Sequence, residues 1–283
     1  MRFAHNLRRF GGMRRASSGV APPRVHQFPA RDDNYFYLIH DPNSGETACV
    51  DTPDAARVNV ALKALNYTLT TILNTHHHDD HTAGNEALKA EWGANIIGPG
   101  REGSIPGMDH GVREGDSFKV GKAAFQVLET PGHTLTGITF YLESASAAFV
   151  GDTLFSMGCG RLFEGTPEMM HASIQKLMHL PEETLLWTGH QYFASNAKFA
   201  LSVDSSNKDI LARVANFDDV FDRIDSFSQV SECPLDVTTV ANEKATNPFC
   251  RTQSPEIRAC LGMDCNASDE EVFGELRRRK DVF

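Results

Sequence analysis

The segment Thr75–His81 contains four histidines and two aspartates in seven residues, directly after the apolar stretch Ile72–Leu73. A hydrophobic core could not satisfy so many imidazoles, and a solvated loop has no need of them. Divalent metal ions bind both groups, since zinc-like cations accept neutral imidazole nitrogen and carboxylate oxygen as ligands. The run therefore predicts a fold in which a loop at the end of a strand surrounds a metal site.

The spacing within this run provides two pairs of candidate ligands. His76 and His78 alternate, so an extended loop directs both rings to the same side. Asp80 and His81 follow as a second pair, one step further round the loop. Two pairs indicate a site for two metal ions, while His77 is expected to point away from them.

Three more candidate ligands lie at the ends of apolar segments, each close to a glycine. His133, Asp152 and His190 each follow a predicted strand. Glycine lets the backbone turn sharply there and leaves the neighbouring side chain free to project. Asp51 also ends a predicted strand and is a candidate to orient a metal ligand by hydrogen bonding, with a turn cap as the alternative. Together with the histidine-rich run, the three strand-end residues predict a complete metal site.

The composition is that of an ordinary globular chain with an acidic balance. Of 283 residues, 41% are hydrophobic and 23% charged, and the formal net charge is −10. Nucleic-acid and anionic-membrane binders carry an excess of Lys and Arg, so the acidic balance argues against both as partners. The sequence also has no uninterrupted apolar stretch of roughly 20 residues, the length needed to cross a bilayer. We therefore expect a monomer with a small-molecule partner, whose anionic groups are held by a local basic cluster.

The first twenty residues differ from the rest in charge. They carry five arginines and two serines, with no acidic residue before Asp32. This composition is typical of a mitochondrial or plastid transit peptide, and the missing apolar segment argues against a secretory signal. We expect residues 1–22 to be a transit peptide and the mitochondrion to be the location, with the cytoplasm as the alternative if the segment is an untargeted tail. Without these five arginines the formal charge of −10 becomes −15.

Short β-type segments alternate with turns and occasional helices through residues 23–195. The expected strands are Asn34–Ile39, Thr47–Asp51, Thr70–Leu73, Ala94–Ile97, Ala123–Glu129, Ile138–Leu142, Ala147–Gly151 and Leu185–Thr188. Helices are expected at Asn85–Trp92 and Pro167–Leu180, the second with Thr166 as its N-cap. Many short strands with helices between some of them predict an α/β fold of two packed sheets with helices outside.

The β signal is lost beyond this point, and residues 196–283 are expected to form a second, α-helical domain. Apolar residues recur at helical spacing behind cap candidates between Asp204 and Asn207. They are Ile210, Leu211, Val214, Phe217, Phe221 and Ile224. Ser254 before Pro255 opens another helix, and Ser268-x-x-Glu271 is a capping-box pattern that opens the last one.

These motifs together resemble the metallo-β-lactamase superfamily and, within it, the glyoxalase II family of hydroxyacylglutathione hydrolases. The resemblance covers nearly everything from Arg24 to Phe283. It rests on Asp33-Asn34-Tyr35, Thr75–His81, Gly132-His133-Thr134, Gly151–Arg161, Glu164-Gly165-Thr166, Gly189-His190, Asn247-Pro248-Phe249 and Leu276–Asp281. Many chemistries share the histidine-rich run, whereas Gly158-Cys159-Gly160 and the C-terminal segment are more specific.

The resemblance implies an αββα sandwich with a two-metal site at one edge of the paired sheets. The implied ligands are His76, His78 and His133 for one ion, Asp80, His81 and His190 for the other, and Asp152 as the bridge. Two ions lower the pKa of a bridging water and stabilise an oxyanion, so Asp80 and Asp152 are the residues expected to share in catalysis. Zinc is the expected metal, with iron and manganese as alternatives.

The resemblance also implies the reaction, hydrolysis of the thioester S-D-lactoylglutathione to D-lactate and glutathione in methylglyoxal detoxification. A thiolate leaves readily because the thiol pKa is about 8.5, so no strong general acid is needed. Glutathione carries two carboxylates, which arginine binds bidentately. The implied substrate-binding residues are Arg161, Phe163, Tyr192, Arg277 and Lys280.

Some of these positions carry an alternative or depart from the family pattern. Arg277 and Lys280 share a face of the last helix, and the alternative for them is a solvated basic helix end. Phe163 stands where many relatives have Tyr, Gly137 replaces a histidine and Gln191 a glutamate. None of these three is a metal ligand, so the departures bear on affinity and not on the reaction type.

The main alternative function is a mononuclear-iron persulfide dioxygenase of the same superfamily, which uses two histidines and one aspartate. That family shares much of the histidine-rich run but lacks a helical tail of this length with the Arg277-x-x-Lys280-Asp281 ending. A phosphodiesterase or nuclease of the same fold conflicts with the charge of −15 outside the leader. The thioesterase is therefore the preferred hypothesis.

Overall fold

The first of two six-stranded sheets combines antiparallel and parallel strands. The computed structural model describes residues 21–101, 105–215 and 237–283. In strand order the sheet consists of β1 (Arg24–Ala30), β2 (Asn34–His40), β3 (Glu46–Val50), β4 (Thr68–Leu73), β5 (Asn95–Pro99) and β6 (His110–Val112). The β3–β4 and β4–β5 pairs are parallel because helices α1 (Ala55–Leu65) and α3 (Asn85–Trp92) cross between them.

The second sheet draws one strand from the C-terminal part of the chain. Its strand order is β14 (Thr238–Thr239), β13 (Leu185–Thr188), β10 (Ala147–Gly151), β9 (Ile138–Leu142), β8 (Ala123–Glu129) and β7 (Ser117–Val120). Strand β14 pairs antiparallel with β13, with Leu185 opposite Thr239. The expectation that β structure ends near residue 195 is therefore wrong at β14, which is too short to produce a sequence pattern of its own.

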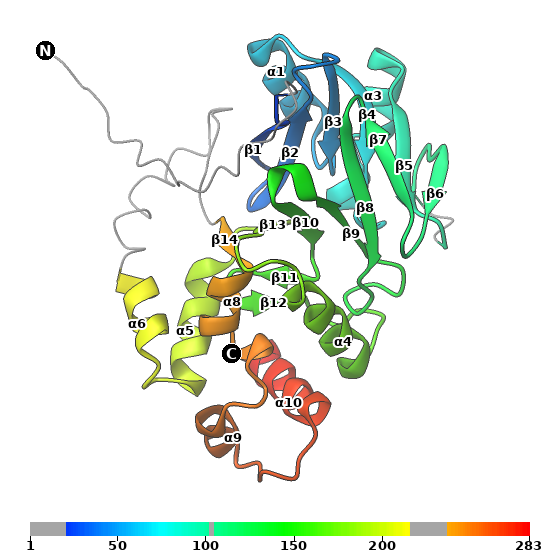
Figure 1. Cartoon of the computed structure of the whole chain (residues 1–283). Coiled ribbons are helices and arrows are strands. Elements are labelled where there is room, and N and C mark those ends of the chain that lie inside the picture. Colours follow the sequence, from blue (N-terminus) through cyan, green and yellow to red (C-terminus); the bar gives the residue numbers. More distant parts are fainter. Residues whose placement is uncertain (1–20, 102–104, 216–236) are drawn as a thin grey trace, which may run out of the picture.

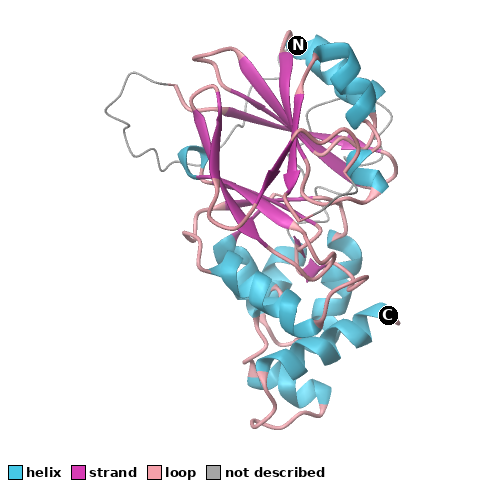
Figure 2. Ribbon diagram, turned by 90° about the vertical axis from the view of Figure 1, so that its right-hand side faces the viewer, coloured by secondary structure: helices cyan, strands magenta, loops and turns pink. Residues whose placement is uncertain are grey.

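Helices cover both outer faces of the paired sheets (Figures 1 and 2). Helices α1 and α3 lie on the first sheet, and the remaining long helices lie beyond the second. These are α4 (Pro167–Met178), α5 (Phe193–Val203), α6 (Lys208–Ala215), α8 (Val240–Thr246), α9 (Pro255–Leu261) and α10 (Asp269–Asp281). Helix α5 begins at Phe193, so it spans the domain boundary expected at residues 195–196. Short elements complete the fold: α2 (Asp79–Thr82), the 3₁₀ turns η1 (Glu143–Ala145) and η3 (Pro248–Cys250), and the hairpin β11 (Leu154–Phe155) with β12 (Gly158–Cys159).

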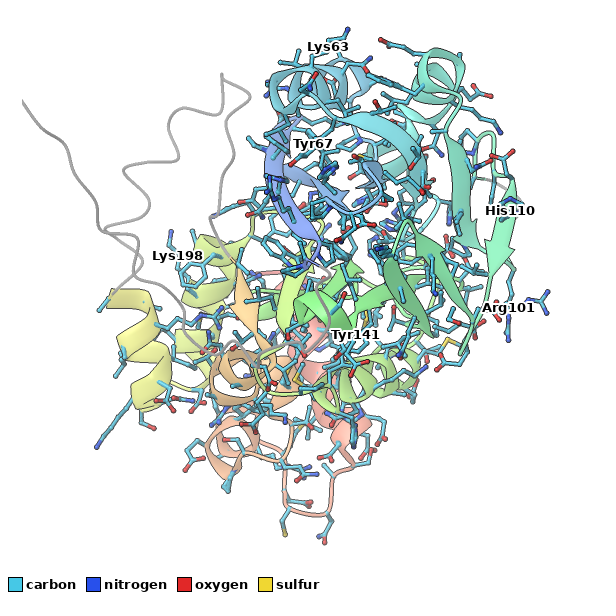
Figure 3. All side chains as sticks on the ribbon, turned by 45° about the horizontal axis from the view of Figure 1, so that its top comes forward. Lys63, Tyr67, Arg101, His110, Tyr141 and Lys198 are labelled. Carbon is cyan, nitrogen blue, oxygen red and sulfur yellow. The ribbon has the colours of Figure 1, made fainter. Side chains whose placement is uncertain are left out.

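Three of the four clusters of buried apolar side chains form layers against the sheets, which confirms the αββα sandwich. Between the sheets, Tyr37 of β2 packs against Phe149 and Trp187 of the second sheet, with ring centroids 5.4 Å apart in both contacts. A second layer joins α1 and α3 to the first sheet, and a third joins α4, α9 and α10 to the second. Lys63 on α1 lies at the outer edge of the molecule, whereas Tyr141 on β9 lies within the third layer (Figure 3). Burial on both faces explains why β2, β9 and β10 read as nearly continuous apolar runs.

The predicted helix starts are confirmed by their capping hydrogen bonds. Thr166 accepts a hydrogen bond from the backbone of Met169 at the start of α4, and Ser254 accepts one from Ile257 at the start of α9. Ser268 forms the complete capping box of α10. Of the apolar residues expected at helical spacing after Asp204, Phe217, Phe221 and Ile224 lie outside the described residues. Among the residues described, every helix is too short or too polar to cross a membrane.

Candidate metal centre

The seven predicted ligands come together at one edge of the two sheets, where several strands end. The loop after β4 carries His76 and His78, and the short helix α2 carries the next pair. From the second sheet, His133 follows β8, Asp152 follows β10 and His190 follows β13. An isolated bridge between Asn34 and His190 joins the two sheets at this edge. Residues far apart in the sequence therefore meet because both sheets end at the same place.

The ligand atoms form two groups of three with one carboxylate between them. Within each group the atoms lie within 4.8 Å of one another; the groups are His76, His78 and His133, and Asp80, His81 and His190. Nε2 of His133 lies 3.0 Å from Nδ1 of His78, and the Nε2 atoms of His81 and His190 are 3.3 Å apart. Asp152 reaches both groups, with one oxygen 3.5 Å from His133 Nε2 and the other 3.5 Å from His81 Nε2.

Two buried atoms of this cluster test whether a cation fits. Nε2 of His76 and Oδ1 of Asp152 have no hydrogen-bond partner among the described residues. A buried polar atom without a partner is costly, and both atoms face the other ligand atoms. A divalent cation between the two groups would satisfy both of them. The donor set of imidazole nitrogen and carboxylate oxygen therefore fits zinc, iron or manganese.

The second ring nitrogen of several histidines is held by a partner outside the cluster. Asp51 Oδ2 lies 2.8 Å from Nδ1 of His81 and also accepts a hydrogen bond from the Thr75 hydroxyl. Asp33 Oδ1 lies 2.7 Å from Nδ1 of His190. Such contacts fix which nitrogen faces a metal ion and orient the ring. Asp51 makes the contact expected of an orienting residue, while Asp33 was missed, although it begins the Asp33-Asn34-Tyr35 motif.

Two further contacts complete this support. The backbone carbonyl of Arg161 accepts a hydrogen bond from Nδ1 of His133 at 2.8 Å. Asn34 Nδ2 donates to Asp80 Oδ2 at 3.0 Å. His77, expected to point away from the metal ions, joins neither of the two ligand groups and lies 3.2 Å from Glu164, in the segment that carries the substrate-binding candidates. Contacts with several neighbouring segments thus hold the loop Thr75–His81 in place.

The pKa values of the cluster reflect burial and the close contact of histidines with carboxylates. Burial lowers the pKa of His81, but Asp152 and Asp51 outweigh it and raise that pKa to about 10, so a metal ion binding here would displace a proton from this ring. Burial raises the pKa of Asp152, but His190 and His81 outweigh it and hold the pKa below its ordinary value. Burial, then the charge of His81, keeps the pKa of His76 well below its ordinary value, so this ring stays neutral as a metal ligand must.

A pocket of about 430 Å³ opens in front of the cluster, and all five predicted substrate-binding residues line it. The part lined by His78, Asp80, His133, Asp152 and His190 is called the metal side below. The part lined by Arg161, Arg277 and Lys280 is called the basic side. The remaining walls of the pocket include the hairpin residues Phe155 and Cys159 and the helix residue Asn196.

The two predicted aromatic contacts lie directly against rings of candidate metal ligands. Tyr192 stacks parallel to His190 with ring centroids 5.0 Å apart, and burial raises its pKa to about 12. Phe163 is 63% exposed, with its ring 5.1 Å from that of His133 and 5.7 Å from that of His78. The exposed Phe163 ring therefore stands beside the metal side, where a substrate can contact it.

The basic side tests the alternative left open for the last helix, a solvated basic helix end. Arg277 is only 5% exposed, so that alternative is wrong for this residue. Its Nη1 donates to the carbonyl of Cys159 at 2.8 Å, and its guanidinium lies 5.3 Å from the ring of Phe249. Lys280 Nζ donates to the carbonyl of Ser195 at 3.1 Å. Burial, followed by the charge of Arg277, lowers the pKa of Lys280 to about 8.

The hairpin β11–β12 that walls the pocket is held from the helical layer by residues that no site prediction included. Asn247 Nδ2 donates to the carbonyls of Phe155 and Gly158 at 3.3 Å and 2.9 Å. The fully buried Glu243 accepts hydrogen bonds from the backbone of Met157 and from Asn247. Asn247-Pro248-Phe249 was noticed as a motif, but only the folded chain places it behind the hairpin.

Comparisons with known proteins agree with this architecture. The family model described as Metallo-beta-lactamase superfamily matches residues 32–190. The family model described as Hydroxyacylglutathione hydrolase C-terminus matches residues 191–283. Two curated relatives named hydroxyacylglutathione hydrolase, from Brucella anthropi and Brucella ovis, are each 47% identical to the chain. They cover 94% and 92% of this chain and 100% and 98% of their own lengths. Among solved structures, ETHE1 from Myxococcus xanthus has a TM-score of 0.61 at 26% identity, covering 92% of this chain and 99% of its own.

The paired sheets with their histidine-rich edge and the match over residues 32–190 define a protein of the metallo-β-lactamase superfamily. The C-terminal helical layer narrows this class, because its match is specific to one family. With 47% identity to relatives over nearly their whole length, the chain belongs to the hydroxyacylglutathione hydrolase family.

Proposed function

We propose that the chain hydrolyses the thioester S-D-lactoylglutathione to D-lactate and glutathione, and so serves methylglyoxal detoxification. One observation carries the proposal: five of the seven candidate metal ligands and three cationic side chains line the same pocket. The metal side suits attack on a carbonyl carbon, and the basic side suits the carboxylates of glutathione. The family to which the chain belongs carries the same activity in its name.

We further propose that the site holds two divalent ions, and that the native metal is zinc. His76, His78 and His133 would hold one ion, while Asp80, His81 and His190 would hold the other, with Asp152 between them. When bound, such ions lower the pKa of water towards neutrality and polarise a carbonyl oxygen. Imidazole and carboxylate also accept iron or manganese, so metal analysis of the protein purified from its native source tests this proposal.

The side chains of the pocket would position the substrate between the two sides. Lys280 and Arg161 would attract the glycine carboxylate of glutathione, since both present charge to the pocket. The rings of Phe163 and Tyr192 would flank the thioester, because each already lies against a metal-ligand imidazole. Since a thiolate with a pKa of about 8.5 departs readily, no side chain is required as a strong acid.

One experiment separates this function from the persulfide dioxygenase. The purified protein is given S-D-lactoylglutathione while thioester loss is followed, and given glutathione persulfide while oxygen uptake is followed. Metal content is measured on the same sample. We expect rapid thioester loss, no oxygen uptake and close to two metal ions per chain. Oxygen uptake with a single iron ion and an intact thioester would instead assign the dioxygenase.

The location of the enzyme is a separate proposal. We propose that Met1 to about Val20 directs the chain to the mitochondrion, because five arginines and no acidic residue are typical of such leaders. A reporter fused to these twenty residues should enter mitochondria, and the same leader with its arginines changed to glutamine should not. A reporter that stays wholly in the cytosol would contradict the proposal.

A further inference from the structure

Two cations of the basic side, Arg277 and Arg161, already lie next to a carboxylate of the protein itself. Oδ1 of Asp281, at the end of α10, lies 2.9 Å from Nη2 and 3.1 Å from Nε of Arg277. The same oxygen lies 3.8 Å from Nε of Arg161. One acidic side chain therefore partly neutralises two of the three cations expected to bind the substrate.

The contact occupies one of the edges through which a guanidinium binds a carboxylate. Nε and Nη2 of Arg277 form such an edge, and Asp281 already accepts a hydrogen bond from Nε and forms an ion pair with Nη2. Arg277 does not depend on Asp281 alone for its position, because the carbonyl of Cys159 and the ring of Phe249 hold it as well. The main effect of Asp281 is therefore to offset the positive charge of Arg277 and to occupy the Nε and Nη2 edge of its guanidinium, which a substrate carboxylate could otherwise bind.

Lys280 has a different environment. In the described part of the chain no carboxylate oxygen lies within 4.0 Å of its Nζ, which donates to the Ser195 carbonyl and lies 5.6 Å from the ring centroids of Phe199 and Phe283. A carbonyl and two aromatic faces orient the ammonium without neutralising it. Lys280 is thus the cation of the basic side whose charge is left for a substrate.

We propose that Asp281 is a specificity-determining residue that weakens the hold of the pocket on glutathione by acting as an internal competitor for Arg277 and Arg161. The proposal rests on the proposed glutathione thioester substrate. The carboxylates of glutathione are unchanged in the substrate, the transition state and the free glutathione product. A contact that binds them equally in all three lowers KM without raising kcat and also holds the product. Asp281 limits this uniform binding and leaves Lys280 as the leading carboxylate contact.

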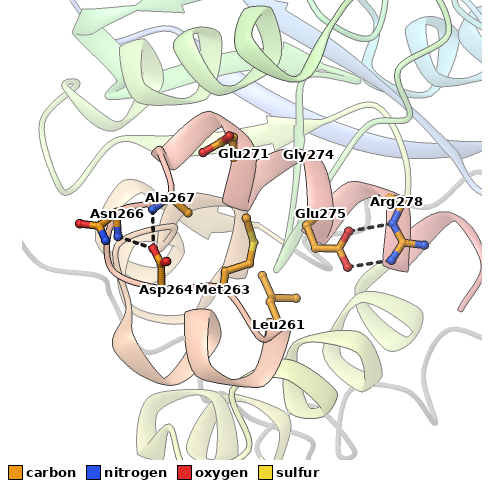
Figure 4. Close-up of a pocket in the computed structure, with 9 residues that line it drawn as sticks. All are labelled: Leu261, Met263, Asp264, Asn266, Ala267, Glu271, Gly274, Glu275 and Arg278. Carbon is orange, nitrogen blue, oxygen red and sulfur yellow. Dashed lines mark hydrogen bonds and ion pairs between the residues drawn. The ribbon is translucent and has the colours of Figure 1, made fainter.

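The test compares two variants of Asp281 with a control on the same helix. Asp281→Asn keeps an oxygen that can accept from Arg277 and removes only the charge, whereas Asp281→Ala removes both. The control is Glu275→Gln, which removes one negative charge from α10 in a different pocket, where Glu275 pairs with Arg278 at 2.7 Å (Figure 4). Measured quantities are KM for S-D-lactoylglutathione, the inhibition constant of free glutathione, and the same two values at high salt.

We expect Asp281→Asn to lower both KM and the glutathione inhibition constant by about threefold or more, with the effect shrinking as salt screens the added charge. Asp281→Ala should change both values in the same direction, and Glu275→Gln should change neither. An unchanged KM in Asp281→Asn with a raised KM in Asp281→Ala would overturn the inference, because Asp281 would then only position Arg277. Loss of folding in both variants would overturn it too. A wild-type chain that fails to cleave the thioester would refute the proposed function instead.

Discussion

The two sides of the pocket reach their geometry in different ways. On the metal side, most imidazoles have a partner behind them, such as Asp51 for His81 and Asp33 for His190, so the rings are held before any ion arrives. On the basic side, Arg277 is buried and paired while Lys280 keeps its charge for a ligand. The comparison teaches that a preorganised site for metal ions is built beside a site whose affinity is moderated. The former supports catalysis and the latter allows product to leave.

The largest expected effect tests the carboxylate that joins the two ligand groups. Asp152→Ala should weaken binding of both metal ions and lower turnover by at least about 100-fold, the upper range for a lost contact that supports a metal site. Metal content and kcat on S-D-lactoylglutathione are measured together. The matched control is Asp79→Ala, which removes a carboxylate that is 83% exposed and paired with Arg31. A variant of Asp152 with full metal content and near-normal turnover would end the two-metal proposal.

The next effect tests whether the metal side is held from behind. Asp51→Asn replaces the carboxylate that accepts from His81 and from Thr75, so it should lower metal affinity by about 10-fold to 100-fold. The measurement is competition with a chelator of known affinity. KM for substrate at saturating metal should change little, because Asp51 does not line the pocket. An effect on KM with unchanged metal affinity would contradict this prediction, because Asp51 would then act on substrate binding and not on the metal side.

A smaller effect is expected on the basic side. Lys280→Ala should raise KM about tenfold, since a hydrogen bond to a charged group contributes about 1.5–3 kcal/mol, and it should leave metal content unchanged. Arg277→Ala should raise KM as well and also lower the melting temperature, because it leaves the Cys159 carbonyl and Asp281 without their partner. A thioester whose glycine carboxylate is converted to an amide should be insensitive to Lys280→Ala. An equal rise in KM for both thioesters would mean that α10 supports the fold and does not bind the glycine carboxylate of the substrate.

The smallest effect concerns pH. Because burial and then Arg277 lower the pKa of Lys280 to about 8, its ammonium carries charge below that pH and loses it above. A bound carboxylate favours the charged form, so KM should begin to rise as the pH passes about 8. Lys280→Arg should remove this rise, since guanidinium stays charged throughout the range. A rise in KM that persists unchanged in Lys280→Arg would assign the titration to another group.

Much of the fold followed from local sequence signals. Four strands match the expected ranges to the residue: Ala123–Glu129, Ile138–Leu142, Ala147–Gly151 and Leu185–Thr188. None of these strands is the edge of its sheet, and each carries a clear signal: an apolar run in Ile138–Leu142 and Ala147–Gly151, and an alternation of buried and exposed residues in Ala123–Glu129. Strand β1 was missed because it contains Pro29 and forms the edge of its sheet, where a strand can carry proline and polar residues. Helix α1 was missed too, and only Val58, Ala61 and Leu62 of its residues are buried.

By itself, the sequence determined which residue types are available for the chemistry: the histidine-rich loop, the strand-end residues and the basic final helix. Only the tertiary structure decided their partners. Asp33 lies behind His190 although 157 positions separate them, and Asp281 of the final helix lies 3.8 Å from Nε of Arg161. The reason is physical. Local spacing fixes the direction of a side chain within its own element, whereas a contact between elements depends on how sheets and helices pack, and packing is determined by the whole core.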